Sequence, residues 1–149
     1  MRWAWEGVFS MEIPEGWKVS EAGSLIEVAP PDPVGAAHIS ALRRTRVGGI
    51  AKGEAALLAT DFAAKQGALG AIPSEICDKQ QCSARLNFQT ADDRGPYYWH
   101  VETRVWNGRA LICSYTHDGK HETAKREAVT MFSSIQTTWR QGLISGRCA

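Results

Sequence analysis

The sequence predicts a single α+β domain, in which an antiparallel β-sheet of six to seven strands packs with two main helices. Three observations indicate this fold class. Short segments that alternate apolar and polar residues, as strands do, recur along the chain. Turn residues separate neighbouring segments, and strands joined by hairpins form antiparallel sheets. Two longer segments carry apolar residues at helical spacing.

Three strands are expected in the first third of the chain. Residues 8–13 alternate in polarity, and Pro14-Glu15-Gly16 ends this strand with turn residues. Residues 24–29 form a second strand, which is followed by a proline-rich break. Residues 37–47 form a third. Its end carries an arginine cluster, which we interpret as a solvated strand end, with a contact surface as the alternative: Arg43, Arg44 and Arg46.

The first helix is expected at residues 52–68, where apolar side chains recur every three to four positions and Gly67 and Gly70 close the segment. The second is expected at residues 121–136. Four further strands between the helices span residues 71–77, 82–90, 97–106 and 110–117.

Asn107-Gly108 joins the last two strands and is the strongest hairpin signal in the chain. The expected order is therefore β-β-β-α-β-β-β-β-α. One domain covers residues 1–137, and a tail covers residues 138–149.

Composition excludes several functional classes. The chain has 149 residues, 44% hydrophobic and 22% charged, with a net charge of +1. This near-neutral balance disfavours nucleic acid as a partner. No apolar run is long enough to span a bilayer, so no membrane association is expected. The first nine residues lack the pattern of a secretory signal, so we expect a cytoplasmic location if Met1 is the natural start.

The opening strand and its turn, Phe9-x-Met11-x-Ile13-Pro14-x-Gly16-Trp17, resemble the start of the PsbP-like superfamily. The middle helix, the antiparallel strands, the Asn-Gly hairpin and the closing helix that ends near Ile135 are also similar to this superfamily. It includes PsbP, the Ran guanine-nucleotide release factor, DcrB lipoproteins and Eag-type chaperones of type VI secretion effectors. The lipoprotein branch needs a cysteine near the N-terminus, and none precedes Cys77.

This resemblance implies a non-catalytic protein-binding module. The expected function is that of a bacterial cytoplasmic adaptor or chaperone for a secreted effector, or of a toxin-immunity protein. Its expected partner is that effector or toxin. An alternative is a small-molecule or lipid binder with a cavity between the sheet and the first helix. A cysteine-dependent enzyme is the third hypothesis.

One strand face is the candidate partner-binding surface. On residues 97–106 the side chains of one face are the more apolar, and we assign that face to the core. The opposite face mixes aromatic rings with charges, as protein interfaces do, and the neighbouring strand adds polar groups to it. A plain solvated sheet face is the alternative. The expected contact residues are Arg85, Asn87, Tyr98, His100, Glu102, Arg104 and Trp106.

The tryptophans at the two ends of the domain raise the question of a homodimer. Trp3 and Trp5 precede the first strand at alternating positions. They either extend that strand and pack on the core, or cap a dimer contact. Trp139, beyond the last helix, raises the same question.

No catalytic, metal or cofactor site is assigned. Cys113 and His117 share a strand face by period-two spacing, but Cys113 lies in an apolar run typical of buried filler. His117 and His121 have the spacing of a helical metal pair, yet a turn separates them.

The remaining cysteines are expected to be thiols. Cys77 and Cys82 flank a hairpin loop where a disulfide is the alternative, and two free thiols are favoured in a reducing cytosol. A zinc site that adds Cys113 lacks a fourth ligand. Cys148 is expected to be exposed in the tail.

Overall fold

The computed structural model describes residues 1–32, 34–43, 52–106 and 108–137. The expected tail at residues 138–149, with Trp139 and Cys148, lies outside these residues. Arg44, Arg46 and Asn107 also lie outside them. No helix of the described part is long and apolar enough to cross a membrane.

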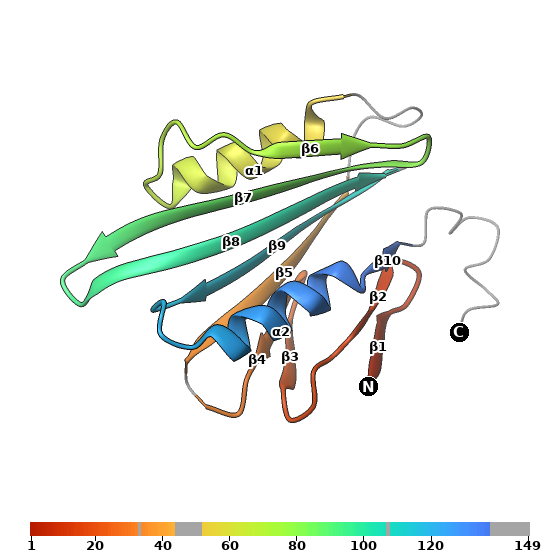
Figure 1. Ribbon diagram of the computed structural model, residues 1–149. Helices are drawn as coiled ribbons and strands as arrows, with labels where there is room; N and C mark the ends of the chain where they lie inside the picture. Colours follow the sequence, from red (N-terminus) through yellow and green to blue (C-terminus); the bar gives the residue numbers. More distant parts are fainter. Residues whose placement is uncertain (33, 44–51, 107, 138–149) are drawn as a thin grey trace.

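The described residues form an α+β fold with a seven-stranded antiparallel sheet and two helices, as expected, and with a second, small sheet that was not expected (Figure 1). The main sheet has seven strands in the order β3-β4-β5-β9-β8-β7-β6, and the second has three in the order β1-β2-β10. Every pairing is antiparallel. The elements are β1 (Arg2–Trp5), β2 (Phe9–Glu12), β3 (Lys18–Ala22), β4 (Leu25–Ala29), β5 (Gly35–Arg43), α1 (Glu54–Lys65), β6 (Ser74–Cys77), β7 (Gln81–Asp92), β8 (Gly95–Trp106), β9 (Arg109–His117), α2 (Glu122–Ser133) and β10 (Gln136–Thr137).

The first strands are arranged differently from the sequence prediction. The strand expected at residues 8–13 exists as β2, but it pairs with β1 and β10 in the small sheet. The main sheet instead begins with β3, which the sequence analysis did not predict. Four of the five residues of β3 are exposed, so its sequence lacks the alternation that marks a half-buried strand.

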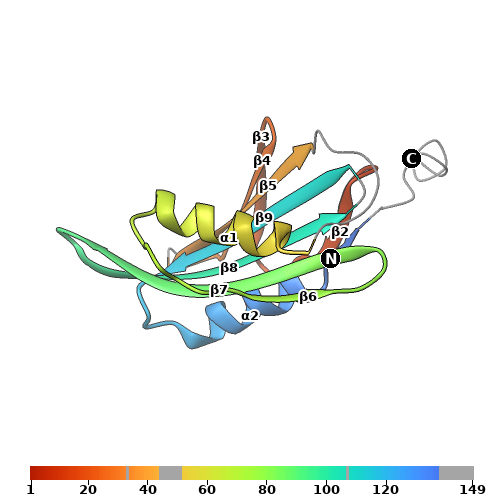
Figure 2. The ribbon, with the colours of Figure 1, turned by 90° about the horizontal axis from the view of Figure 1, so that it is seen from above.

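The helices cover opposite faces of the main sheet (Figure 2). The α1 face is tightly closed where α1 presents small side chains to the sheet. Ala55, Ala59 and Ala63 are fully buried against β7 and β8. The buried Thr103 hydroxyl of β8 donates a hydrogen bond of 2.7 Å to the Ala55 carbonyl oxygen at the start of α1. Small residues at this contact let the helix approach the strands closely.

The second core lies between α2, the small sheet and the other face of β5 and β9. Trp3 and Trp5 of β1 pack against Phe9, with ring centroids 5.9 and 6.1 Å apart. Both tryptophans are therefore partly buried against this core. The tryptophans pack on the core, as one of the two alternatives expected, but from a separate strand that pairs with β2 rather than extending it.

Gly35 at the start of β5 admits a large ring from the neighbouring strand. Tyr115 of β9 is fully buried, and its hydroxyl has no hydrogen-bond partner among the described residues. A Cβ atom at residue 35 would lie 2.6 Å from this hydroxyl oxygen and 2.7 Å from the Thr116 carbonyl oxygen. Both distances are below van der Waals contact, and one of the atoms is backbone, so a side chain does not fit here without displacing the strand.

We predict that Gly35→Ala lowers the free energy of unfolding by about 3 kcal/mol, because it overpacks a closed core. Urea unfolding followed by tryptophan fluorescence measures this loss. Gly23→Ala is the control: Gly23 has a positive φ of 62° but open space around its Cβ position, so it should cost only about 1 kcal/mol. Equal losses at the two glycines would contradict the proposed clash.

Candidate functional site

The sheet face expected to bind a partner lies beneath α2. His100, Glu102 and Trp106 of β8 are 5%, 4% and 0% exposed. The expectation of an open or solvated face is therefore wrong for these three residues. Because β8 is covered by α1 on one side and by α2 on the other, the more polar face is also a core face.

A hydrogen-bonded network fills the polar part of this interface. His100 Nε2 lies 2.7 Å from Glu102 Oε2, and His100 Nδ1 lies 2.8 Å from Asn87 Oδ1. The His100 ring stacks on Phe132 of α2, with centroids 6.2 Å apart. Arg85 Nε lies 3.6 Å from Glu102 Oε1. Burial of these groups is tolerated because each polar atom named here has a partner.

Arg104 fastens the C-terminal end of α2 to the sheet. Its guanidinium donates to the carbonyl oxygens of Phe132 and Ile135 at 2.9 and 3.0 Å. These carbonyls lie at a helix end, where backbone acceptors lack intrahelical donors and a cation is favourable. Arg104 therefore has a clear structural role.

Three of the expected contact residues lie at the edge of the sheet face that α2 covers. The Arg85 side chain is 57% exposed and Tyr98 is 37% exposed. Asn87 is also exposed, although its side chain reaches His100. The seven residues are thus brought together on one face, but only these three are open to solvent to a substantial degree.

The cysteine and histidine considered for catalysis do not form a nucleophile and base pair. Tyr115 lies between Cys113 and His117 on the same face of β9, and its ring stacks on His117 at 5.4 Å. Burial raises the pKa of the Cys113 thiol well above its ordinary value, and Glu102 raises it further. A neutral, buried thiol is a poor nucleophile.

His117 is held as a structural side chain. Its Nδ1 accepts a hydrogen bond of 3.0 Å from the Gly119 backbone N–H, and its ring also stacks on Tyr98. Burial lowers its pKa, and the nearby Lys125 lowers it further. His121 turns instead toward Asp118, at 3.3 Å. The two histidines are thus engaged separately, on either side of the turn.

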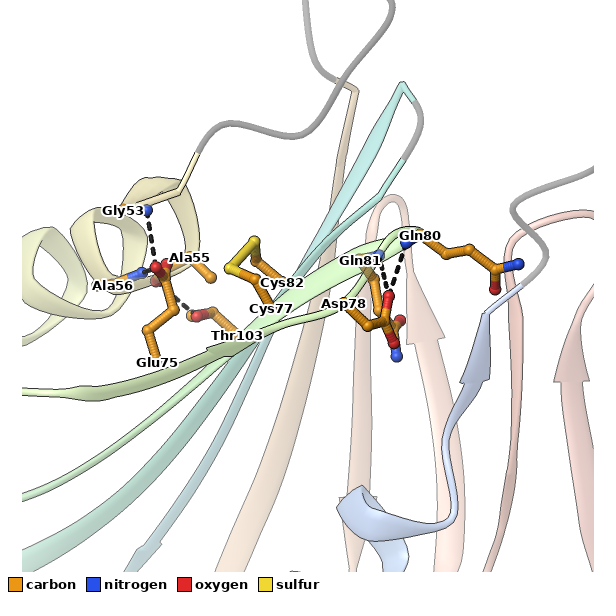
Figure 3. The surroundings of a disulfide bond; sticks show 10 residues. All are labelled: Gly53, Ala55, Ala56, Glu75, Cys77, Asp78, Gln80, Gln81, Cys82 and Thr103. Carbon is orange, nitrogen blue, oxygen red and sulfur yellow. Dashed lines mark hydrogen bonds between the residues drawn. A yellow bond between two sulfur atoms is a disulfide. The ribbon is translucent and has the colours of Figure 1, made fainter.

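Cys77 and Cys82 form a disulfide, so the favoured expectation of two free thiols is wrong (Figure 3). They face each other across the β6–β7 hairpin with their Cα atoms 4.0 Å apart. The Asp78 N–H donates to the Gln81 carbonyl oxygen and closes the hairpin. The cysteines are therefore the adjacent pair without mutual backbone hydrogen bonds, where strands approach most closely. With Glu75 they form the one group of potential metal ligands in the described part of the chain, and the disulfide occupies both sulfurs.

Two adjoining open features lie along α2, on the side away from the main sheet. One hollow of about 440 Å³ lies between α2 and the end of β2. A second, of about 430 Å³, lies between the start of α2, the Pro14–Trp17 turn and the proline-rich loop. Both are lined by Glu15, Thr123 and Glu127, so they adjoin. We call them together the α2 hollow.

The walls of the α2 hollow are partly apolar and mostly acidic at the rim. Five carboxylate residues line it against two permanently cationic ones, Lys120 and Arg126. Trp17 holds the turn to the helix, because its indole N–H donates to Glu127 Oε2 at 2.7 Å. The carboxylate residues are Glu12, Glu15, Asp32, Glu122 and Glu127.

The sequence analysis missed this hollow. Its residues come from β2, two loops and α2, which are separated by about a hundred positions in the chain. The one signal that could have indicated it was the Pro14-x-Gly16-Trp17 turn, together with the acidic residues beside it. From the sequence, that turn indicated the fold but not the hollow.

A smaller hollow of about 250 Å³ lies beside α1, over the part of the sheet that α1 leaves uncovered. Phe62 and Trp99 form one wall, and hydroxyl groups of β5 and β9 form the floor. The expected cavity between α1 and the sheet does not exist where the alanines of α1 pack. The lining residues are Leu25, His38, Ser40, Phe62, Gln66, Trp99, Ile112, Ser114 and Thr116.

The structure has a PsbP-like fold. It is similar to the solution structure of cyanobacterial PsbP (CyanoP) from Synechocystis sp. PCC 6803, with a TM-score of 0.67 and 10% identity over 92% of this chain and 91% of that one. It is also similar to LpqN of Mycobacterium tuberculosis, described as involved in cell envelope biogenesis. That match has a TM-score of 0.56 and 13% identity over 87% and 83% of the two chains.

A third similar structure is a protein from Bacteroides thetaiotaomicron, with a TM-score of 0.64 and 18% identity over 91% of this chain. This chain spans about half of that protein, 47% of its length. No protein-family model and no curated protein matches the sequence. The likenesses therefore establish the fold, and function has to be argued from the site.

We predict that Glu102→Ala lowers the free energy of unfolding by about 2–3 kcal/mol, because it leaves His100 without its buried acceptor. Chemical denaturation measures the loss. Glu27→Ala is the matched control, since it removes a histidine–glutamate contact of 2.8 Å at the surface. Such an exposed pair is worth less than about 1 kcal/mol. Equal effects would show that the network does not anchor α2.

We predict that the purified protein carries the Cys77–Cys82 bond and that Cys77→Ser/Cys82→Ser loses about 2 kcal/mol of stability. Peptide mapping by mass spectrometry without reductant identifies the bond, and urea unfolding measures the loss. Adding a reductant should destabilise the wild type but not the double variant. Two alkylatable thiols at these positions in unreduced protein would refute the assignment.

Proposed function

We propose that this protein is a non-catalytic module that binds a segment of another protein in the α2 hollow. The observation that carries the proposal is the pair of adjoining hollows along α2, of about 440 and 430 Å³. Each falls in the range of natural binding pockets, about 300–1,000 Å³. Their shared lining makes one elongated depression, which suits a chain segment better than a compact metabolite.

The chemistry of the lining indicates what kind of segment fits. Ile13, Pro14 and Met131 supply an apolar surface in one half, and Pro30 and Pro31 supply it in the other. The surplus of carboxylates at the rim favours a partner with lysine or arginine beside its apolar side chains. Opposite charges across such an interface steer association and exclude wrong partners.

Within this proposal the chain is a bacterial adaptor or chaperone for a secreted effector, such as a type VI effector, or a toxin-immunity protein. Both roles require one dedicated protein partner. A gene for an effector or for a toxin next to the gene for this chain distinguishes the two roles.

The cytoplasmic location stays a prediction. The Cys77–Cys82 disulfide is the observation against it, because such bonds persist mainly in oxidising compartments. Alkylation of free thiols in intact host cells, followed by mapping of this bond, distinguishes the two locations. Free thiols indicate the cytoplasm, and an intact bond indicates an oxidising compartment.

A small-molecule binder is the second candidate, and the α1 hollow supports it. Its volume of about 250 Å³ is below the usual range for ligand pockets, and its floor is polar rather than lipid-like. Native mass spectrometry of protein from the host tests for a retained ligand. The α2 hollow is larger than the hollow beside α1, and it therefore favours a protein segment.

The third hypothesis, a cysteine-dependent enzyme, has no support from the geometry. Cys113 is 1% exposed, and Tyr115 lies between it and His117 on the strand. A normal phenotype of Cys113→Ala in the host would remove this hypothesis.

We predict that the charge-reversed variant Glu15→Lys/Glu122→Lys loses its protein partner, because both exposed carboxylates line the α2 hollow. Affinity purification from the host should recover one dominant protein with the wild type and about tenfold less with the variant. Glu6→Lys/Glu21→Lys is the control, with two exposed carboxylates outside the hollow. It should retain the partner in full.

A photo-crosslinker at Thr123 should label the same partner, whereas one at Gln89 on β7 should not. Retention of the partner by the charge-reversed variant, or recovery of no partner at all, would contradict the proposal.

A further inference from the structure

Within the described part of the chain, β6 is the outermost strand of the main sheet and has an unpaired edge. It lies at one end of the strand order, and β7 is its one partner among these residues (Figure 2). An open edge presents backbone N–H and C=O groups that can pair with another strand. Such an edge is an interaction surface if its side chains and geometry favour pairing.

The register shows which backbone groups face outward. The Asp78–Gln81 pair closes the hairpin with a backbone hydrogen bond of 2.9 Å. Since hydrogen-bonded pairs alternate along antiparallel strands, Ser74 and Ile76 bond to β7, and Glu75 and Cys77 direct their backbone groups away from it. No backbone hydrogen bond from these outward groups occurs within the described residues.

This short strand is held unusually firmly (Figure 3). The disulfide joins Cys77 to β7. Two residues earlier, the Glu75 carboxylate accepts hydrogen bonds from the backbone N–H groups of Gly53 and Ala56 at the start of α1, at 2.7 and 3.0 Å. A four-residue edge strand is thus fixed both to the sheet and to the helix. The entropy cost of ordering it for pairing is already met by the fold.

Large apolar side chains are exposed on β6 and on the segment that precedes it. Ile76 is 75% exposed, and the segment before β6 contributes Ile72 at 88% and Leu69 at 84%. The four residues of β6 include neither lysine nor proline, which commonly block edge pairing. β6 therefore combines a rigid unpaired edge with an exposed isoleucine at its centre.

We propose that β6 pairs with β6 of a second copy of this chain, antiparallel and centred on Ile76. In this register Glu75 of each copy lies opposite Cys77 of the other, and the two outward-facing residues exchange both backbone hydrogen bonds. Ile76 lies opposite the second copy's Ile76, in the closely spaced pair between the two hydrogen-bonded pairs. Both isoleucines project from the sheet face opposite the disulfide. Ser74 faces Asp78, so no like charges are opposed.

The self-complementarity of this register is the reason for choosing a second copy as the occupant. With a two-fold axis through Ile76, the outward N–H and C=O groups of Glu75 and Cys77 are paired in both copies. The exposed Ile76 side chains of the two copies are buried against each other. The α2 hollow is lined by β2, α2 and loops and not by β6. Dimerisation therefore leaves the proposed partner site open, and the two proposals can fail independently.

Sedimentation velocity over a concentration series tests the dimer with the full chain. The wild type should show a monomer–dimer equilibrium, and Ile76→Lys should weaken it about tenfold or more, because an edge lysine opposes pairing. Leu57→Lys is the matched control, since Leu57 is a 59% exposed apolar residue on α1. It should dimerise like the wild type.

Hydrogen exchange followed by NMR tests the register. The exchange rates of the Glu75 and Cys77 amides should fall as the protein concentration rises. No other exposed amide should slow more than these two. A wild type that stays monomeric throughout would overturn the proposal, as would a dimer insensitive to Ile76→Lys. Pairing of β6 with an unrelated peptide, without self-association, would also overturn it.

Discussion

Burial of β8 on both faces is the constraint on which the rest of the structure depends. Val101, Thr103 and Val105 lie under α1, and His100, Glu102 and Trp106 lie under α2. A strand in this position normally carries apolar residues on both sides, because buried polar groups need partners. Here the polar side is satisfied by a network that also fixes the position of α2.

The position of α2 then determines where the chain can bind anything. Arg104 holds the C-terminal end of the helix, and Trp17 binds Glu127 near its middle. No side chain of the described residues caps its N-terminal end at His121. Among the described residues, the side of α2 turned away from the main sheet is bordered by the end of β2 and by two loops. Those elements do not fill the space beside it, and the α2 hollow results.

Much of the fold was accessible from the sequence because its signals are local. Strand patterns identified seven of the ten strands of the described residues, helical spacing identified both helices, and the turn at Pro14-x-Gly16-Trp17 indicated the PsbP-like fold. β3 escaped because an exposed edge strand needs no apolar alternation. The polar face of β8 was misassigned as open because covering it depends on α2, which lies some twenty residues further along the chain. A sequence pattern cannot show that a buried histidine and a buried glutamate will hydrogen-bond to each other.

The sequence alone also did not decide whether Cys77 and Cys82 are bonded, and the structure shows which part of the fold their disulfide stabilises. The bond closes a very short loop, so its effect on the entropy of the unfolded chain is smaller than that of a long-range bridge. Its greater structural effect is local. It joins an exposed four-residue strand to β7 at the pair where the backbone makes no hydrogen bonds, and Glu75 on the same strand holds the start of α1. Loss of the bond would therefore loosen the edge of the sheet and the first turn of α1 before it affected the central strands, whose stability comes from the two helices.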